Sequence, residues 1–236
     1  MDFKFLHAAD LHLDSPMRGL TRYEGAPVTE LREATREALK NLVHLAVEEG
    51  VDFVLLAGDL YDGDWRDFNT GLFLQRRLKE LEQAGIPVFA VKGNHDADSR
   101  IAKSLTLPGN VTMFDSRRPH TAKLETLRVA IHGQSFATAK VEEDLSSLYP
   151  ETVEGFFNIG LLHTSADGRA GHASYAPCTV ESLAARGYHY WALGHVHQRE
   201  VLHREPWIVF PGNIQGRHIR ETVKKAPPLL LWRITE

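Results

Sequence analysis

Polar residues of the types that bind divalent metals follow several apolar segments of this sequence. Residues 86–91 form an apolar run, and Gly93-Asn94-His95-Asp96 then places an amide, an imidazole and a carboxylate in consecutive positions. Comparable clusters end other apolar runs: Asp10-Leu11-His12, Gly58-Asp59-Leu60-Tyr61-Asp62, His163 and Gly194-His195-Val196-His197. Each cluster alone is also consistent with a turn or a solvated surface pair. Their repeated position after apolar runs favours one shared site over a set of separate turns.

The candidate metal ligands combine oxygen and nitrogen donors and include no thiolate. They are Asp10, His12, Asp59, Asn94, His163, His195 and His197. Such donors favour Mn²⁺, Fe²⁺ or Zn²⁺ over a cysteine-type structural zinc site. The set is too large for one catalytic ion that keeps an open position, and it suits two ions with one bridging carboxylate. Two ions roughly 3.5–4 Å apart can generate a hydroxide and hold both oxygens of an in-line phosphoryl displacement, so the sequence predicts a two-metal hydrolase.

The apolar runs that precede these clusters have the length and composition of buried strands. Strands are expected at 3–9, 51–57, 86–91, 157–162 and 188–193, with amphipathic helices at 29–49 and 67–83. On the second helix the expected apolar positions are Phe68, Leu72, Phe73, Leu78 and Leu81. The alternation of strand and helix predicts a mixed α/β fold, in which ligands gather at the carboxyl ends of strands.

The remaining segments carry weaker patterns. Further strands are expected at 111–114, 127–133 and 228–234, hairpins at 120–136 and 200–210, and short helices at 99–105, 142–148 and 179–185. Residues 165–178 are rich in Gly, Ala and Ser and indicate a flexible loop beside the site. His132 falls inside an expected strand, where we expect it to pack or to support a ligand rather than to bind metal.

The composition is that of an ordinary globular protein, with 236 residues, 43% hydrophobic and 25% charged, which suits one domain over residues 1–236. Cys178 is the single cysteine, so an internal disulfide is excluded and a reducing compartment is indicated. With neither a signal peptide nor an apolar run of bilayer length, we expect a cytoplasmic protein without membrane contact. A net charge of −4 does not favour a polyanion partner, although two bound cations would offset it locally.

The ordered motifs together resemble the calcineurin-like metallophosphoesterase superfamily, from Asp10 to His197. The resemblance implies a β-sandwich of two mixed sheets flanked by helices. It implies that one metal is held by Asp10, His12 and His197, that the other is held by Asn94, His163 and His195, and that Asp59 bridges them. It also makes His95 a catalytic residue that stabilises the transition state or protonates the leaving oxygen, with Asp62 orienting it. Asp62 can alternatively be a solvated loop carboxylate, and Asp96 is expected to support the ligands.

Differences within the motifs point to one branch of this superfamily. Phosphoprotein phosphatases have an arginine directly after the second motif, but here Asp62 is followed by Gly63-Asp64. The first and last motifs are more similar to SbcD-type DNA repair nucleases, and residues 210–222 are similar to their YhaO-like members. This branch implies a manganese-dependent exo- or endonuclease that hydrolyses DNA and has an SbcC- or YhaN-like coiled-coil ATPase as its partner. It also implies a homodimer, for which the helix at 29–49 is our candidate.

Two observations keep other functions open. The further C-terminal domain of these nucleases is not expected in this sequence, and the overall charge is acidic. Both favour an alternative in which the protein is a phosphodiesterase or phosphatase of small substrates, such as cyclic nucleotides. A third alternative is a binding subunit that keeps a vestigial metal site, but the full ligand set argues against it.

Overall fold

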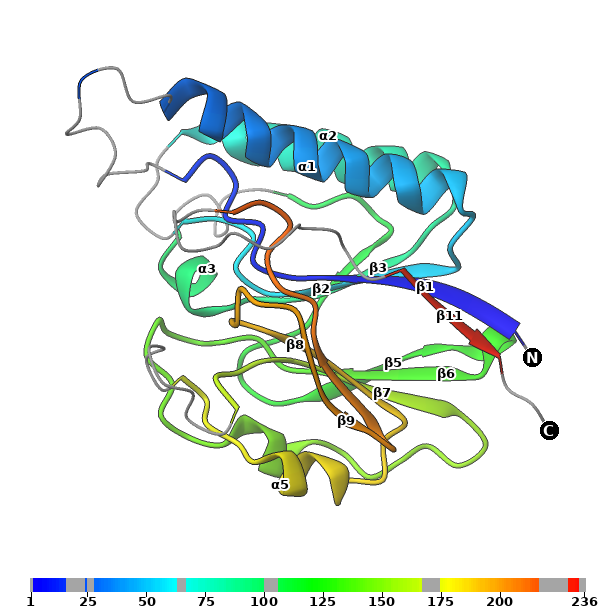
Figure 1. Cartoon of the computed structure of the whole chain (residues 1–236). Helices are drawn as coiled ribbons and strands as arrows, with labels where there is room; N and C mark the ends of the chain where they lie inside the picture. The colour runs from blue at the N-terminus through cyan, green and yellow to red at the C-terminus, as the bar shows by residue number, and fades with distance from the viewer. Residues whose placement is uncertain are drawn as a thin grey trace.

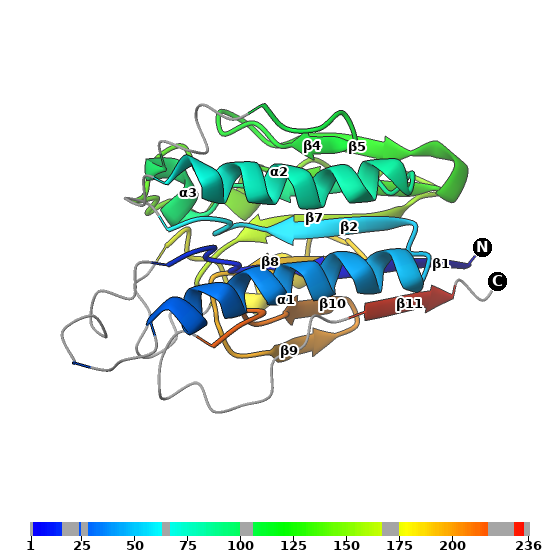
Figure 2. The same cartoon turned by 90° about the horizontal axis from the view of Figure 1, so that it is seen from above.

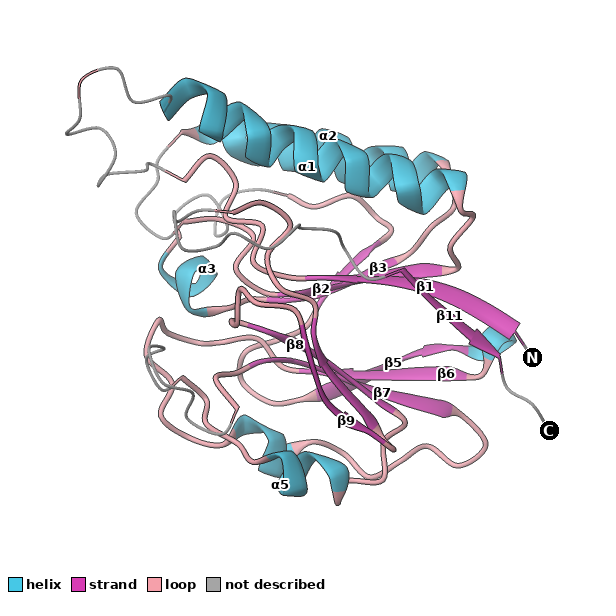
Figure 3. Cartoon of the chain, in the orientation of Figure 1, coloured by secondary structure: helices cyan, strands magenta, loops and turns pink. Residues whose placement is uncertain are grey.

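Two mixed β-sheets pack face to face at the centre of the molecule, in a computed structural model that describes residues 2–15, 24, 28–62, 67–99, 106–166, 175–216 and 229–233. Helices cover the outer faces of both sheets (Figures 1 and 3). The predicted α/β sandwich of two mixed sheets flanked by helices is therefore confirmed.

The first sheet has five strands in the order β11-β1-β2-β3-β4. Its strands are β1 (Asp2–Ala8), β2 (Phe53–Ala57), β3 (Val88–Val91), β4 (Val111–Met113) and β11 (Leu229–Arg233). The first four are parallel to one another, and β11 pairs antiparallel with β1. The carboxyl ends of β1, β2 and β3 consequently lie at the same edge of the sheet.

The second sheet has six strands in the order β5-β6-β7-β8-β10-β9. Its strands are β5 (His120–Leu124), β6 (Val129–Gly133), β7 (Phe157–His163), β8 (Tyr190–Gly194), β9 (Glu200–Arg204) and β10 (Trp207–Phe210). The inner strands run parallel, while β5 and β9 are antiparallel to their neighbours. The ends of β7 and β8 therefore face the same side of the molecule as those of the first sheet (Figure 1).

The longer helices lie over the first sheet, side by side (Figure 2). They are α1 (Val28–Glu48) and α2 (Phe68–Gln83), whereas α5 (Val180–Ala184) covers the second sheet. Helix α3 (Asn94–Asp98) lies at the edge where the strand ends meet, and short 3₁₀ segments occur at η1 (Glu125–Leu127) and η2 (Leu145–Leu148).

Alternation along β2 shows how the sandwich is held together. Phe53 and Leu55 face the second sheet, whereas Val54 and Leu56 face the helices. Between the sheets, the rings of Phe53 and Phe5 stack with centroids 5.1 Å apart. Full burial of such a side chain contributes about 1.5–3 kcal/mol, so the two apolar layers provide a rigid base for the polar loops at the strand ends.

The buried face of α2 differs from the prediction. Leu78 and Leu81 are buried as expected, but Phe68 and Leu72 are 56% and 42% exposed. The buried positions at the start of the helix are instead Thr70, Gly71 and Leu74. The observed face buries Leu74, Leu78 and Leu81, and the hydroxyl of Thr70 on the same face donates a hydrogen bond to the buried Asp14.

Other differences concern element boundaries. Helix α3 begins at Asn94, inside the polar cluster, whereas most of the helix expected at 99–105 lies outside the described residues. The helix expected at 142–148 is only a 3₁₀ turn, and most of the loop expected at 165–178 is also outside the described part. The expected helix at 179–185 and both hairpins are present.

Three expectations about single features can be compared with the structure. Cys178 is buried, with its Sγ 3.2 Å from the hydroxyl of Thr164. His132 is packed in β6, where its ring nitrogens lie 2.8 Å from Thr121 Oγ1 and 3.0 Å from Asn158 Oδ1. No helix within the described ranges is both long enough and apolar enough to cross a bilayer.

Candidate metal centre

The loops after β1 and β2 run beside each other at the edge where the strands end. The Asp10 amide donates to the carbonyl of Gly58 at 3.0 Å, and the His12 amide donates to that of Asp59 at the same distance. Asp10, His12 and Asp59 have φ angles of 54°, 42° and 52°, which are uncommon for residues with a side chain. Such backbone persists only where its surroundings hold it in place, and here it turns all three side chains toward the same region.

The first cluster of candidate ligands comprises Asp10, His12 and His197, whose donor atoms lie within 4.8 Å of one another. His12 Nε2 is 3.2 Å from His197 Nε2 and 3.9 Å from Asp10 Oδ1. Asp10 and His12 are each 1% exposed. The loop after β1 and the end of β8, at opposite ends of the sequence, together supply the cluster.

The second cluster comprises Asp59, His163 and His195, with donor atoms again within 4.8 Å of one another. His163 Nε2 is 3.5 Å from Asp59 Oδ2 and 3.0 Å from Asn94 Oδ1. The structure therefore brings together every side chain that the sequence singled out as a candidate ligand.

Asp59 lies between the two clusters. Its Oδ2 is 3.5 Å from His163 Nε2 in one cluster and 3.9 Å from His12 Nε2 in the other. Its Oδ1 accepts a hydrogen bond of 2.9 Å from the His95 amide. A second link joins the clusters, because the His195 amide donates to both carboxylate oxygens of Asp10 at 3.0 and 3.2 Å.

Asp62 contacts two imidazoles through one oxygen. Its Oδ1 is 3.0 Å from His12 Nδ1 and 3.1 Å from His95 Nδ1. Because an ionised carboxylate only accepts, both Nδ1 atoms carry hydrogen and both Nε2 atoms become the reactive positions. Asp62 is 6% exposed, and the Ser15 hydroxyl donates to its other oxygen. The alternative of a solvated loop carboxylate is therefore wrong for Asp62.

The contacts of His163 indicate whether a divalent cation fits among these residues. Its Nδ1 is 2.9 Å from the Ala57 carbonyl, which only accepts, so this nitrogen carries the hydrogen. In the neutral ring, Nε2 then directs a lone pair at the oxygens of Asp59 and Asn94. Converging acceptors repel one another unless a cation or a proton lies between them. A divalent cation fits this donor set, and neutral imidazole with carboxylate is the form that binds it.

The charges of the second cluster depend on one another. Burial alone would lower the pKa of His163, but Asp59 and Asp10 raise it to about 9. Burial alone would raise the pKa of Asp59, but His163 and His12 hold it below its ordinary value. In the metal-free state an imidazolium thus balances the buried carboxylate, and a bound cation would take over that role.

Two glycines permit the close approach of these groups. A Cβ on Gly93 would lie 2.3 Å from Asp59 Oδ1 and 2.8 Å from His163 Nε2. A Cβ on Gly194 would lie 1.9 Å from the Ala57 carbonyl oxygen, where the ends of the two sheets meet. A larger residue at either position would displace candidate ligands. Steric contact therefore explains why both motifs have glycine at these positions.

Asp96 joins the loop after β2 to the loop after β3. It is 1% exposed and accepts hydrogen bonds from the Tyr61 amide at 3.0 Å and the Gly93 amide at 3.1 Å. Burial, followed by the charge of Asp59, raises the pKa of Asp96 to about 7. These two hydrogen bonds come from backbone amides, and the supporting role of Asp96 stays a prediction.

The sequence did not single out two further residues at this centre. Ser15 reaches Asp62, as described above, and the ring of Tyr175 lies edge-on to His195 with centroids 5.4 Å apart. Both stand close to a motif or to the glycine-rich segment, but a hydroxyl or aromatic residue beside a motif is a weak signal by itself.

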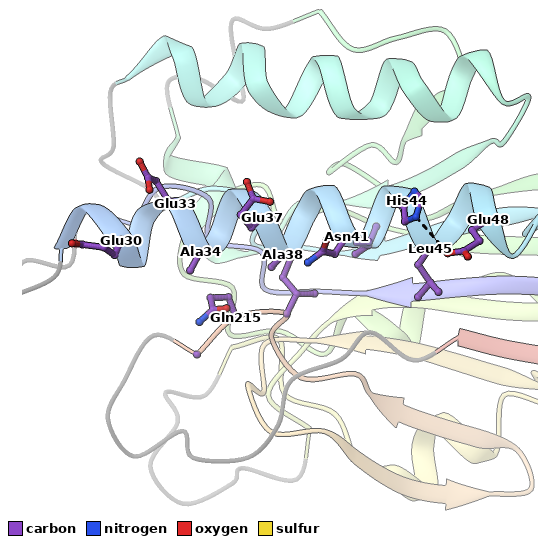
Figure 4. Close-up of a pocket in the computed structure, with 13 residues that line it drawn as sticks. Glu30, Glu33, Ala34, Glu37, Ala38, Asn41, His44, Leu45, Glu48 and Gln215 are labelled. Carbon is purple, nitrogen blue, oxygen red and sulfur yellow. Dashed lines mark ion pairs between the residues drawn. The ribbon is translucent and has the colours of Figure 1, made fainter.

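A pocket of about 970 Å³ lies away from the two clusters, along α1 and against residues 214–216 (Figure 4). Glu30, Glu33, Glu37 and Glu48 line it. Carboxylates without a bound cation repel phosphate, so this pocket is a poor site for a phosphate ester. The chemistry of the molecule is instead concentrated at the strand ends.

A family model described as calcineurin-like phosphoesterase matches residues 3–199. The chain belongs to the calcineurin-like phosphoesterase family. The matched stretch contains every residue of the two clusters, together with Asp62 and His95. The resemblance seen in the motifs is thereby confirmed, and the family is one of metallophosphoesterases, hydrolases that act on phosphate esters.

Relatives of this phosphoesterase are longer than the chain. Uncharacterized metallophosphoesterase YhaO of Bacillus subtilis (strain 168) is 39% identical over 229 residues, covering 95% of this chain and 56% of that protein. A DNA double-strand break repair protein Mre11 of Methanopyrus kandleri is 27% identical over 234 residues, covering 89% of this chain and 48% of that protein. The chain thus spans about half the length of these relatives.

Solved structures share the fold of this phosphoesterase. TT1561 of Thermus thermophilus has a TM-score of 0.51 at 15% identity, and the match covers 91% of each chain. A dimetal phosphatase from Danio rerio also has a TM-score of 0.51, at 13% identity, and the match covers 90% of this chain and 88% of that one. At these identities the similarity concerns the fold.

Proposed function

We propose that the chain is a two-metal phosphodiester hydrolase. The residues that bind its first ion are Asp10, His12 and His197. The residues that bind its second ion are Asn94, His163 and His195. Asp59 bridges the two ions, which are most readily Mn²⁺, with Fe²⁺ or Zn²⁺ also compatible with these donors.

The observation that carries this proposal is the position of Asp59 between two groups of buried nitrogen and oxygen donors. One carboxylate oxygen faces His163 at 3.5 Å and His12 at 3.9 Å. A single cation would leave one of these groups without a counter-charge. Two cations, when bound, would activate a water molecule and stabilise the charge that develops on the phosphoryl group.

His95 is the proposed catalytic acid. Its side chain is 39% exposed, while its Nδ1 is held by Asp62 at 3.1 Å. This contact leaves Nε2 as the ring atom that can exchange a proton with a bound substrate. We propose that His95 donates this proton to the leaving oxygen and that Asp62 keeps the ring oriented and protonated.

We further propose that the substrate is DNA and that cleavage proceeds as an exo- or endonuclease reaction in DNA repair. Support comes from the relatives named as double-strand break repair proteins, which share 25–27% identity with this chain over most of its length. From the resemblance of the motifs to SbcD-type nucleases, we also propose an SbcC- or YhaN-like coiled-coil ATPase as the partner of the protein.

A substrate panel tests this function. The purified chain is incubated with Mn²⁺ and single-stranded DNA, blunt duplex DNA or bis-p-nitrophenyl phosphate, with a chelator and the His95→Ala variant as controls. We expect hydrolysis of DNA and of the small diester, with both activities lost in the two controls. If His95→Ala cleaves DNA as fast as the unmodified protein, the cleavage comes from a contaminating nuclease or the catalytic role assigned to His95 is wrong.

The acidic net charge favours one second candidate, a phosphodiesterase of small substrates. A polyanion such as DNA binds most readily to basic surfaces, whereas a small ester needs only the charge of the metal ions. Hydrolysis of bis-p-nitrophenyl phosphate without cleavage of any DNA would support this candidate and overturn the nuclease proposal.

A further inference from the structure

Asp14 is a buried carboxylate close to the metal centre that belongs to neither cluster of candidate ligands. It follows Asp10 and His12 on the loop after β1, and it is 3% exposed. Its φ angle of 54° is again in the left-handed region. A buried charge must be compensated by its neighbours, so the partners of Asp14 indicate what the residue does.

The partners of Asp14 come from both long helices. Arg36 of α1 donates two hydrogen bonds to the carboxylate, from Nε to Oδ1 at 2.8 Å and from Nη2 to Oδ2 at 2.5 Å. Thr70 of α2 donates its hydroxyl to Oδ2 at 2.5 Å. The Asp14 amide donates to the hydroxyl of Thr35 on α1 at 3.2 Å. The loop is thus fixed to α1 and α2 at one residue.

Arg36 is itself held in place. Its guanidinium lies over the ring of Phe73 on α2, 5.0 Å from the centroid. A planar guanidinium that binds a carboxylate through two nitrogens and packs on an aromatic ring has little freedom to move. The position of Asp14 is therefore set by the helical layer as well as by its own loop.

The preceding part of the loop is joined to this anchor as well as to the loop after β2. Asp10 and His12 have left-handed backbone, and the ion pair of Asp14 with Arg36 ties the end of their loop to the helical layer. The Ser15 amide donates to the His12 carbonyl at 3.2 Å, so the anchor is continuous with the candidate ligand. Movement at Asp14 would therefore be transmitted to His12.

We infer that Asp14 is a positioning residue which, through Arg36 and Thr70, holds the loop that presents Asp10 and His12 to the metal. This inference rests on the proposed two-metal function. It adds a physical link between the helical layer and the metal centre, because both partners of the carboxylate side chain lie on α1 and α2.

A metal titration with variants of Arg36 tests the inference. Arg36→Met keeps an unbranched apolar side chain but removes the guanidinium and its paired hydrogen bonds, and Arg36→Lys restores a charge that can make one of them. The matched control is Lys40→Met, which removes an exposed ion pair with Glu37 one turn along the same helix. Mn²⁺ alone is the probe, and its dissociation constants are measured by calorimetry on protein that is shown to be folded by circular dichroism.

We expect Arg36→Met to weaken the binding of one Mn²⁺ by about 10-fold, the lower end of the loss caused by removing direct partners of metal ligands, because Arg36 acts through Asp14. Arg36→Lys should fall between this variant and the unmodified protein, and Lys40→Met should bind Mn²⁺ unchanged. Thr70→Val, which removes a single hydroxyl, should weaken the binding of the same Mn²⁺ ion. This variant provides a second test if Arg36→Met does not fold.

Two results would overturn the inference. One is unchanged Mn²⁺ affinity in folded Arg36→Met and Thr70→Val, even with lowered thermal stability, because the cluster would then be structural only. The other is a loss of Mn²⁺ affinity in Lys40→Met as large as that in Arg36→Met. Failure of the proposed function is distinguishable, since the unmodified protein itself would then bind no pair of Mn²⁺ ions.

Discussion

At the scale of single residues, Asp62 contacts two imidazoles to which we assign different roles. Its Oδ1 holds Nδ1 of both His12 and His95, so each ring presents Nε2. The His12 side chain is 1% exposed and faces the first cluster, whereas that of His95 is 39% exposed. Burial among acceptors favours metal binding for the first ring, and access to substrate favours proton transfer for the second.

His95→Ala should abolish turnover while both metal ions stay bound. The side chain is placed to donate a proton, and general acid catalysis contributes about 10²- to 10⁴-fold to a rate. The change is measured as kcat for bis-p-nitrophenyl phosphate at saturating Mn²⁺, beside the metal content of the protein. Loss of one ion from this variant would mean that His95 is a ligand, contrary to the proposed role.

Asp59→Ala should weaken both metal sites together. The carboxylate lies between the two clusters, so its removal leaves each ion without the shared negative charge. Calorimetric titration with Mn²⁺ measures the effect. As a control, Asp115→Ala removes an exposed aspartate outside the clusters and should leave both affinities unchanged. Two tight sites remaining in Asp59→Ala would show that this carboxylate does not bridge.

At the scale of elements, the ends of the two sheets are in close contact where the metal centre is built. Gly194 ends β8, and its backbone packs against the carbonyl of Ala57 at the end of β2. Asp59 follows β2 by two residues and His195 follows β8 directly. The distance between the sheets at this edge therefore sets the distance between residues of the second cluster.

Gly194→Ala should destabilise the fold and weaken metal binding together. The added Cβ would meet the Ala57 carbonyl at 1.9 Å, and overpacking of this kind costs about 1–3 kcal/mol. Urea denaturation and Mn²⁺ titration measure the two effects. Gly109→Ala is the control, because its Cβ would meet only the end of the Glu82 side chain at 3.2 Å. Identical behaviour of the two variants would contradict the steric explanation.

The sequence predicted the strand ends well because burial and chemistry change there within a few residues. At β3, the apolar run and the polar motif after it identified both the element and the side chains that converge. The face of α2 was predicted less well, because Phe68 and Leu72 fit an apolar stripe although both are exposed. The observed face instead buries Thr70, whose hydroxyl contacts Asp14, 56 residues away in sequence.

The contacts that support the centre could not be predicted for the same reason. Asp14 and Arg36 look like ordinary charged residues of a loop and a helix. Their pairing depends on how α1 lies over the first sheet, which no local pattern specifies. Candidate ligands could be found from sequence because their types and positions recur, whereas supporting residues have no comparable signature.

At the scale of the whole molecule, the outer face of the helical layer carries exposed apolar side chains. Phe68 and Leu72 lie one turn apart at the start of α2 and are 56% and 42% exposed. Grouped exposed apolar residues often mark association surfaces. We propose that this layer pairs with a second copy of the chain, extending the expected role of α1 to include α2.

The double variant Phe68→Glu, Leu72→Glu should shift the protein toward a monomer of 26.5 kDa. Charged residues at the centre of an apolar interface are expensive to bury. Light scattering coupled to size-exclusion chromatography measures the mass, with Leu148→Glu as a control because this exposed leucine lies in η2 beside α5. A monomeric unmodified protein, or a dimeric double variant, would contradict the proposal.

The number and position of the metal ions test the two-metal proposal most directly. A crystal structure of the protein with Mn²⁺, with anomalous diffraction to locate the ions, would show both. We expect two anomalous peaks roughly 3.5–4 Å apart, one beside Asp10, His12 and His197, the other beside Asn94, His163 and His195, with Asp59 between them. A single peak, or two peaks without Asp59 between them, would contradict the proposed centre.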